Sequence, residues 1–467
     1  MQTMSRYELM TTKPVESLVL RLAGPSLVIM MISAMYNMAD TYFVSSLGTS
    51  PTASLGISFS LMALIQAVGF FFGQGAGSFI ARALGARDNE NASRMAATGF
   101  YSSFIAGALI AAAGLVFLTP LCVLLGATPT IMPYARQYLR FILLGAPFMT
   151  SSLTQNNILR FQGSSFYGML GMTSGAVLNV GLDPLFIFGL DMGVSGASLA
   201  TMLSQMVSCA ILFFISCRQK GNIRIYLKNF SPRRSAYKEM LRGGLPSLLR
   251  QGVASIATIF LNRAAGGFGD AVIAAISIVN RVVLVATSAL LGFGQGFQPV
   301  CGFNYGAKRY DRVKKAFWFC MKLCSSVLAV LAVLGFIFAP DIIALFRKDD
   351  LEVVLTGTLA LRVYCFPFPL LGWVILNNMM MQTTGKAVSA SILALSRQGL
   401  FLVPLVFLLD RWLGVLGIQI AMPIADFCTF LLSVPLGLRI LRGMRGESSE
   451  KSFSENSGGG APPIPEE

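Results

Sequence analysis

Long apolar runs fill this chain and restrict it to one class of structure. Runs of about 20 mostly apolar residues, the length that a helix needs to cross a bilayer, recur from Val15 to Leu441. Only 12% of the 467 residues are charged, against about 25% in soluble domains. We therefore predict an all-α integral membrane protein with twelve transmembrane helices. The expected spans are residues 15–45, 53–80, 95–118, 131–157, 165–189, 193–216, 240–262, 271–297, 315–338, 352–381, 387–409 and 413–440.

The sequence also repeats itself at an offset of 221 residues. Pro25–Leu27 matches Pro246–Leu248, and Gly73–Gly75 matches Gly294–Gly296. Six spans is an even number, so both halves start on the same side of the membrane. Parallel repeats of this kind are related by an axis along the membrane normal and enclose a central cleft in transporters that open alternately to each side. The predicted parts are an N-terminal six-helix lobe (1–216), a basic cytoplasmic linker (217–239), a C-terminal six-helix lobe (240–446) and a disordered cytoplasmic tail (447–467).

The formal charge of +15 is concentrated in loops on one side of the predicted spans. Eight basic residues and one acid lie between Arg218 and Arg242, and a second basic cluster runs from Lys308 to Lys315. By the positive-inside rule both termini are cytoplasmic. Contact with anionic lipid is a further expectation. Nucleic acid is not an expected partner, because no basic patch is interleaved with aromatic residues.

Two carboxylates interrupt apolar spans of the first half. At a rise of about 1.5 Å per residue, Asp40, Asp183, Tyr138 and Thr201 should all lie about 9–12 Å below the outer surface. A carboxylate costs about 2.5–3.5 kcal/mol at the centre of a membrane helix, so such residues are usually functional. Two carboxylates in low dielectric are expected to share a proton or a bound monovalent cation.

Further polar residues surround these acids. Asn179 precedes Asp183 by one helical turn, and Asn37 and Tyr36 lie within one turn of Asp40. Pro184 should bend its helix by removing a backbone donor. The alternatives are that Asp40 is an interfacial acid near a helix end, that Asp183 is a structural acid satisfied by Asn179, and that the tyrosines are interfacial anchors.

The second half lacks this layer. Leu261 and Pro404 occupy the positions that match Asp40 and Asp183, and its expected buried charges are Arg281, Arg397 and Asp426. For a substrate cleft we name a separate set of candidates, to which methionines could contribute an adaptable apolar wall. A role for the methionines in the core or facing lipid is an equal alternative. The candidate cleft residues are Asn37, Met149, Arg281, Met380 and Arg397.

Four motifs together resemble the multidrug and toxic compound extrusion (MATE) family, in particular its MepA-type branch. They are YNMADTYFVSSLG at 36–48, GQGAGSFIARALGARD from Gly73, LNVGLDPLFIFG at 178–189 and GFGQGFQPVCGFNYGAKR from Gly292. The resemblance covers essentially all twelve spans. It implies two lobes and a first-lobe cation site at Asp40, Asn179, Asp183 and Thr201, with Tyr36 and Tyr138 nearby.

The resemblance also implies a function. It implies export of amphiphilic, often cationic drugs and toxic compounds in exchange for H⁺ or Na⁺, as in antibiotic resistance, with no cofactor. Sodium at Asp40 and Asp183 is the one metal expected. A second acidic cation site, which some relatives hold in helices 7 and 10, is not expected, because those spans carry no embedded acid. The expected location is a bacterial inner or plasma membrane, as a monomer.

Other functions fit the sequence less well. A lipid-linked oligosaccharide flippase of similar architecture would favour a basic cavity, and Arg250, Arg281 and Arg397 keep that alternative open. An ATP-driven pump is disfavoured because the chain has no G-x-x-x-x-G-K-[ST] motif. An intramembrane enzyme would need a histidine, a metal cluster or an acidic D-D-x-x-D-like motif. The chain has no histidine, and the adjacent acids Asp349 and Asp350 lie in an expected outer loop.

Overall fold

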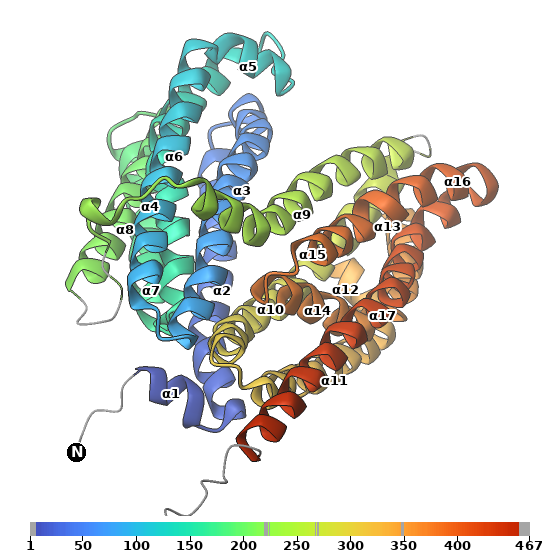
Figure 1. Ribbon diagram of the computed structural model, residues 1–467. Coiled ribbons are helices and arrows are strands. Elements are labelled where there is room, and N and C mark those ends of the chain that lie inside the picture. The colour runs from blue at the N-terminus through green and yellow to red at the C-terminus, as the bar shows by residue number, and fades with distance from the viewer. Residues whose placement is uncertain are drawn as a thin grey trace, which may run out of the picture.

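Two helical bundles form the protein. The computed structural model describes residues 6–218, 223, 225–266, 268, 270–346 and 350–456, and these residues form helices and no strand. The first bundle is built from the first half of the chain and the second bundle from the second half (Figure 1). The bundles touch at one end, which we call the base, and diverge toward the other, which we call the open end. The expected all-α, two-lobe architecture is confirmed.

The first lobe contains the long helices expected from the apolar runs, together with two short helices. Its elements are α1 (Arg6–Thr12), α2 (Val15–Ser45), α3 (Thr49–Gly85), α4 (Asn89–Val116), α5 (Leu118–Leu124), α6 (Met132–Phe161), α7 (Ser165–Pro184), the π-helix η1 (Leu185–Gly189) and α8 (Val194–Arg218). A short 3₁₀ turn, η2 (Leu227–Asn229), lies in the connection to the second lobe.

The second lobe repeats this plan with two of its spans broken. Its elements are α9 (Arg234–Gly266), α10 (Asp270–Gly306), α11 (Tyr310–Ile337), α12 (Ala339–Phe346), α13 (Leu351–Cys365), the 3₁₀ turn η3 (Phe368–Leu370), α14 (Leu371–Thr383), α15 (Ala387–Leu395), the π-helix η4 (Ser396–Leu402), α16 (Val403–Leu413) and α17 (Val415–Asn456). The predicted limits of lobes, linker and tail stay a prediction.

Ten helices in the described residues are long and apolar enough to cross a membrane. The number is eleven if Leu351–Cys365 and Phe368–Thr383, which meet at 45°, form one bent span. Helix α6 lies where the fourth span was expected, yet it is not among them. Buried polar residues such as Thr154, Gln155 and Asn157 lower its hydropathy. They are tolerated because α6 packs between α3, α4 and α8 inside the lobe.

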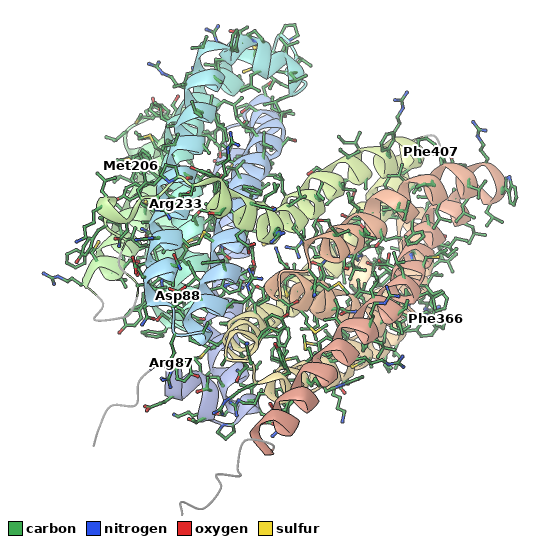
Figure 2. The ribbon with its side chains drawn as sticks, in the orientation of Figure 1. Arg87, Asp88, Met206, Arg233, Phe366 and Phe407 are labelled. Atoms are coloured by element: carbon green, nitrogen blue, oxygen red, sulfur yellow. The ribbon has the colours of Figure 1, made fainter. Side chains whose placement is uncertain are left out.

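The outer flanks of both lobes carry exposed apolar side chains. Met206 on the first lobe, and Phe366 and Phe407 on the second, point away from the helices around them (Figure 2). At the base, the Arg87 guanidinium lies 4.3 Å from the centre of the Tyr7 ring on α1. Apolar flanks and a charged end are the distribution that a bilayer requires. The chain is therefore a multi-pass membrane protein.

The lobes meet at the base through contacts that obey the repeat. A Cβ atom added to Gly85 would lie 2.1 Å from the Phe303 carbonyl oxygen, and one added to Gly306 would lie 2.0 Å from the Arg82 carbonyl oxygen. Gly85 and Gly306, like Arg82 and Phe303, are 221 residues apart. Reciprocal contacts of equivalent residues define a two-fold relation. The axis therefore passes between the ends of α3 and α10.

The chain leaves α3 and α10 by the same turn. Arg87 and Lys308, another pair at the repeat offset, both adopt left-handed backbone conformations, with φ of 63° and 58°. The Asp88 amide donates to the Ala83 carbonyl at 2.8 Å, and the Arg309 amide donates to the Asn304 carbonyl at 2.8 Å. These are helix C-caps that satisfy otherwise unpaired carbonyls. Local geometry was thus retained in both halves while side chains changed.

Candidate cation site and second-lobe cavity

Four helices of the first lobe bring the predicted polar layer together. Asp40 lies on α2, Tyr138 on α6, Asn179 and Asp183 on α7, and Thr201 on α8, and all five are buried. The Tyr138 hydroxyl donates to Asp40 Oδ2 at 3.1 Å. The Asn179 amide donates to Asp183 Oδ1 at 3.3 Å and to Thr201 Oγ1 at 3.3 Å. Residues separated by up to 161 positions in sequence therefore form one polar cluster.

The two acids are held in separate hydrogen-bonded groups. Asp40 pairs with Tyr138, and Asp183 pairs with Asn179, with no hydrogen bond between the acids among the described contacts. They are nevertheless close enough for their charges to interact. A direct link between the two acids would therefore require a bound proton, ion or water between them.

The bend expected at Pro184 takes the form of a change in helix type. Helix α7 ends at Pro184, and five residues of π-helix, Leu185–Gly189, follow directly. Proline has no N–H to donate and crowds the carbonyl four residues earlier, which opens the helical ladder. π-Helical segments are rare and occur often at functional sites. Asp183 thus lies at the junction between a regular helix and a loosened one.

Three oxygens in the cluster have no partner. Asp40 Oδ1, Asn179 Oδ1 and Asp183 Oδ2 are buried and form no hydrogen bond in the structure. No lysine or arginine among the described residues forms an ion pair with either acid. Buried oxygens usually find a donor or a cation, because leaving them unpaired costs free energy. Their chemistry fits a proton or a monovalent cation such as Na⁺.

A cavity of about 170 Å³ adjoins this cluster. Tyr36, Asn179, Thr201 and Met149 contribute to its wall, and none of the described residues that line it is basic. Sequence reasoning missed part of this wall: Ser204, Gln205 and Ser208 continue from Thr201 along α8 and line the same space. Their spacing of three to four residues, which places them on one helical face, was the available signal. We call this space the first-lobe cavity.

The remaining predicted cleft residues do not gather at one place. Met149 lines the first-lobe cavity, whereas Met380 is buried and is not among the residues that line the described cavities. The side chain of Asn37 lies outside the described part of the structure. Arg281 and Arg397 lie in the second lobe and line a different cavity. The assignment of these residues to one substrate cleft stays a prediction.

The expectation that Arg281 is a buried charge is wrong, because its side chain is exposed. Val279 and Val283, two positions away on either side, are buried. Residues two apart lie about 200° around a helix from each other, so Arg281 is on the opposite face of α10. Its guanidinium therefore lies at the rim of the cavity that it helps to form.

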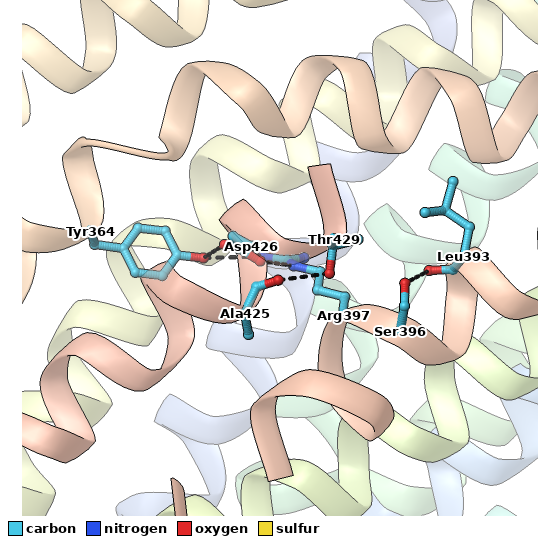
Figure 3. Close-up of polar contacts among 7 residues, drawn as sticks. All are labelled: Tyr364, Leu393, Ser396, Arg397, Ala425, Asp426 and Thr429. Atoms are coloured by element: carbon cyan, nitrogen blue, oxygen red, sulfur yellow. Dashed lines mark hydrogen bonds and ion pairs between the residues drawn. The ribbon is translucent and has the colours of Figure 1, made fainter. Parts of the chain in front are cut away.

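Arg397, which is half-buried, forms a polar group with the buried residues Asp426 and Tyr364. Arg397 Nε lies 2.6 Å from Asp426 Oδ1, and the Tyr364 hydroxyl donates to Asp426 Oδ2 at 3.1 Å (Figure 3). Arg397 lies in the π-helix η4, and Asp426 lies on α17. The close-up shows the tyrosine ring, the carboxylate and the guanidinium in a row. This network compensates the charge of Arg397 within the second lobe.

Comparison with known proteins agrees with this architecture. The family model described as MatE matches residues 25–185 and again 246–408, and the two matches begin 221 residues apart. "Multidrug export protein MepA" from Staphylococcus haemolyticus is 27% identical over 87% of this chain and 90% of its own. The protein of the same name from Staphylococcus aureus strain MSSA476 is 26% identical over 88% of this chain and 91% of its own.

A solved structure is similar throughout. It is described as the outward-facing conformation of a multidrug resistance MATE family transporter of the MOP superfamily. It is 28% identical and superposes with a TM-score of 0.88 over 95% of this chain and 99% of its own. The divergence of the lobes toward the open end is consistent with that description (Figure 1). The chain belongs to the MatE family of membrane transporters.

Proposed function

We propose that this protein exports amphiphilic, cationic drugs and toxic compounds in exchange for H⁺ or Na⁺. One observation carries the coupling part of the proposal: Asp40 and Asp183 are buried in one polar cluster that has unpartnered oxygens, and no described lysine or arginine pairs with either acid. An ionisable residue inside a membrane protein usually marks an ion or proton path. The printed names of relatives, which are multidrug export proteins, support the choice of substrate class.

The base is the cytoplasmic face in this proposal. Basic residues that follow α3 and α10, including Arg87 and Lys308, lie there, as the positive-inside rule requires. Substrate would enter between the lobes when the base is open and leave when the lobes diverge at the other end. Binding of H⁺ or Na⁺ from outside at Asp40 and Asp183 would then drive the return.

The loosened helix after Pro184 provides a means of coupling. A cation at Asp183 would change the hydrogen bonding of Asn179, which joins α7 to α8 through Thr201. An ion can shift a conformational equilibrium only by its difference in affinity for the two states. A site at a π-helix junction, where two backbone arrangements lie close in energy, gives such a difference.

Ethidium efflux from drug-sensitive bacteria that express the full chain tests the proposal. We expect wild type to remove ethidium and Asp183→Asn to lose ion-dependent efflux, because the variant keeps the side-chain shape but has no charge to neutralise. Sodium concentration and pH are varied independently, and the variable that changes the rate identifies the ion. Asp341→Asn, an exposed acid on α12, is the matched control and should behave as wild type.

Normal efflux by Asp183→Asn at every pH and sodium concentration would show that the site assignment is wrong. Protein levels in the membrane are measured in parallel, so that a folding defect is not mistaken for a transport defect. Absence of efflux by well-expressed wild type would instead favour a narrow substrate range or the lipid-linked oligosaccharide flippase.

A further inference from the structure

The second lobe contains a cavity of about 500 Å³ that the proposed coupling mechanism does not use. Its polar wall includes Arg250 on α9, Asn280 and Arg281 on α10, Asn378 on α14, and Arg397 and Gln398 in η4, together with Gln251, Thr258 and Thr287. The remaining wall is largely apolar, with no acidic residue among the residues that line it. Drug-sized molecules occupy cavities of about 300–1,000 Å³. We call this space the second-lobe cavity.

The second-lobe cavity is the repeat counterpart of the first-lobe cavity. Ten pairs of lining residues are separated by 221 positions, and each pair contributes one residue to each cavity. The pairs are Ile29 with Arg250, Met30 with Gln251, Ser33 with Ala254, Tyr36 with Ala257, Gln66 with Thr287, Phe70 with Leu291, Leu153 with Val374, Met172 with Leu393, Ala176 with Arg397, and Thr201 with Met422. The duplication therefore produced two cavities at equivalent positions.

The two cavities differ in charge: the described lining of the first-lobe cavity holds no charged residue, whereas that of the second-lobe cavity holds three arginines. Apolar Ile29 and Ala176 in the first lobe are replaced by Arg250 and Arg397 in the second. Arg397 is compensated by Asp426. Arg250 and Arg281 have no hydrogen-bond or ion-pair partner among the described residues, and Arg250 is close enough to Arg397 for their charges to repel. A cavity with two uncompensated guanidinium groups repels cations and attracts anions.

We propose that the second-lobe cavity binds the anionic head group of an amphiphile, with Arg250 and Arg281 as its ligands and the apolar wall holding the hydrocarbon part. Planar guanidinium groups bind phosphate and carboxylate oxygens through paired hydrogen bonds. Arg281 is exposed, so the head group can approach from outside the lobe. Asn280 supplies a neutral amide nearby, whereas the Asn378 amide already donates to the Ala390 carbonyl at 2.7 Å. The proposal does not depend on coupling at Asp183.

Binding of two detergents with the same tail and opposite heads tests this inference. Dodecyl phosphate or dodecyltrimethylammonium is titrated calorimetrically into the purified full chain in a non-ionic detergent. We expect saturable binding of dodecyl phosphate and at least about tenfold weaker binding of the cation. Arg281→Gln and Arg250→Gln should each weaken dodecyl phosphate binding by about tenfold, because each removes one charge-assisted contact. Competition by inorganic phosphate at similar concentrations would identify a free anion as the ligand instead of an amphiphile.

The control is Arg263→Gln, an exposed arginine on α9 that does not line the cavity. Arg281→Gln alters an exposed side chain without a partner in the described structure, so we expect it to fold even if Arg250→Gln does not. Equal affinity for the two detergents, or unchanged dodecyl phosphate binding by folded Arg281→Gln, would overturn the inference. Loss of efflux in Asp183→Asn with intact dodecyl phosphate binding separates this site from the coupling site.

Discussion

A single methyl group at the base should shift the equilibrium between the closed-base and open-base conformations of the proposed transport cycle. In Gly85→Ala the new Cβ would lie 2.1 Å from the Phe303 carbonyl oxygen and 3.0 Å from the Ala307 nitrogen. Both neighbours are backbone atoms, so no side chain can rotate away. Overpacking costs about 1–3 kcal/mol, and this geometry places the cost near 3 kcal/mol. If the contact exists only when the base is closed, the ratio of closed-base to open-base molecules falls by about 100-fold.

Distances between spin labels at the open end measure that shift. Labels at Thr130 and Arg411, which are exposed on the first and second lobes, report how far the lobes diverge. The native cysteines among the described residues are buried or half-buried, which limits background labelling. We expect Gly85→Ala to shorten the label distance. Gly306→Ala should do so equally, because its Cβ meets the Arg82 carbonyl oxygen at 2.0 Å.

Gly56→Ala is the control, because a Cβ at that position of α3 meets nothing within 4 Å. It should leave the distances unchanged and the protein as stable or slightly more stable. A label distance in Gly85→Ala that matches Gly56→Ala would refute the assignment of the base as a conformational contact. An effect from only one of Gly85→Ala and Gly306→Ala would refute the two-fold relation inferred from their geometry.

Three further changes have defined outcomes. Glu239→Gln removes the ion pair with Arg82 across the base, whose side chains are about one-fifth exposed, together with the pair to Arg242 on the same helix. In the same spin-label assay it should lower the ratio of closed-base to open-base molecules by up to about fivefold, and no change would show that the pair across the base is dispensable. Asp426→Asn leaves Arg397 uncompensated in the second lobe and should lower Tm by about 10 °C. Combining it with Arg397→Met should restore part of the lost Tm. An unchanged Tm for Asp426→Asn in a thermal scan would contradict the role of this pair. Thr201→Val removes the acceptor of the Asn179 amide and should raise the ion concentration for half-maximal efflux by about fivefold, whereas Thr201→Ser should not.

Much of the fold follows from local patterns in the sequence. The apolar runs predicted each long helix, and the 221-residue offset predicted equivalent halves, which the reciprocal contacts at Gly85 and Gly306 display. These features are predictable because hydrophobic length and sequence identity are local properties. Helix α6 was harder to identify as a span from hydropathy, because its polar residues pack against neighbouring helices instead of facing lipid. The irregular helical segments could be predicted only in part. Pro184 predicted a bend where η1 begins, whereas no proline lies within η4 to indicate it.

The candidate sites divide in the same way. Asp183 and Asn179 are one turn apart on one helix, so their pairing was predictable. Arg397 and Asp426 were each expected to be buried, yet their mutual contact depends on how η4 packs against α17. Tyr364 joins them from α13, at a position with no periodic relation to either. Contacts between helices require the packing geometry, which composition and spacing do not contain.

The repeat explains how the two lobes can have differently charged cavities while they keep equivalent contacts at the base. The contacts between lobes at the base use backbone atoms and glycines at equivalent positions, so they restrain side-chain changes there in both halves. The cavities lie away from those contacts, and their side chains are free to diverge, as Ile29 with Arg250 and Ala176 with Arg397 show. One lobe can therefore keep buried carboxylates for a coupling cation while the other develops a positively charged cavity. In the proposed alternating-access cycle, rocking of the lobes about an axis in the membrane plane would expose both cavities together, whatever charge each of them holds.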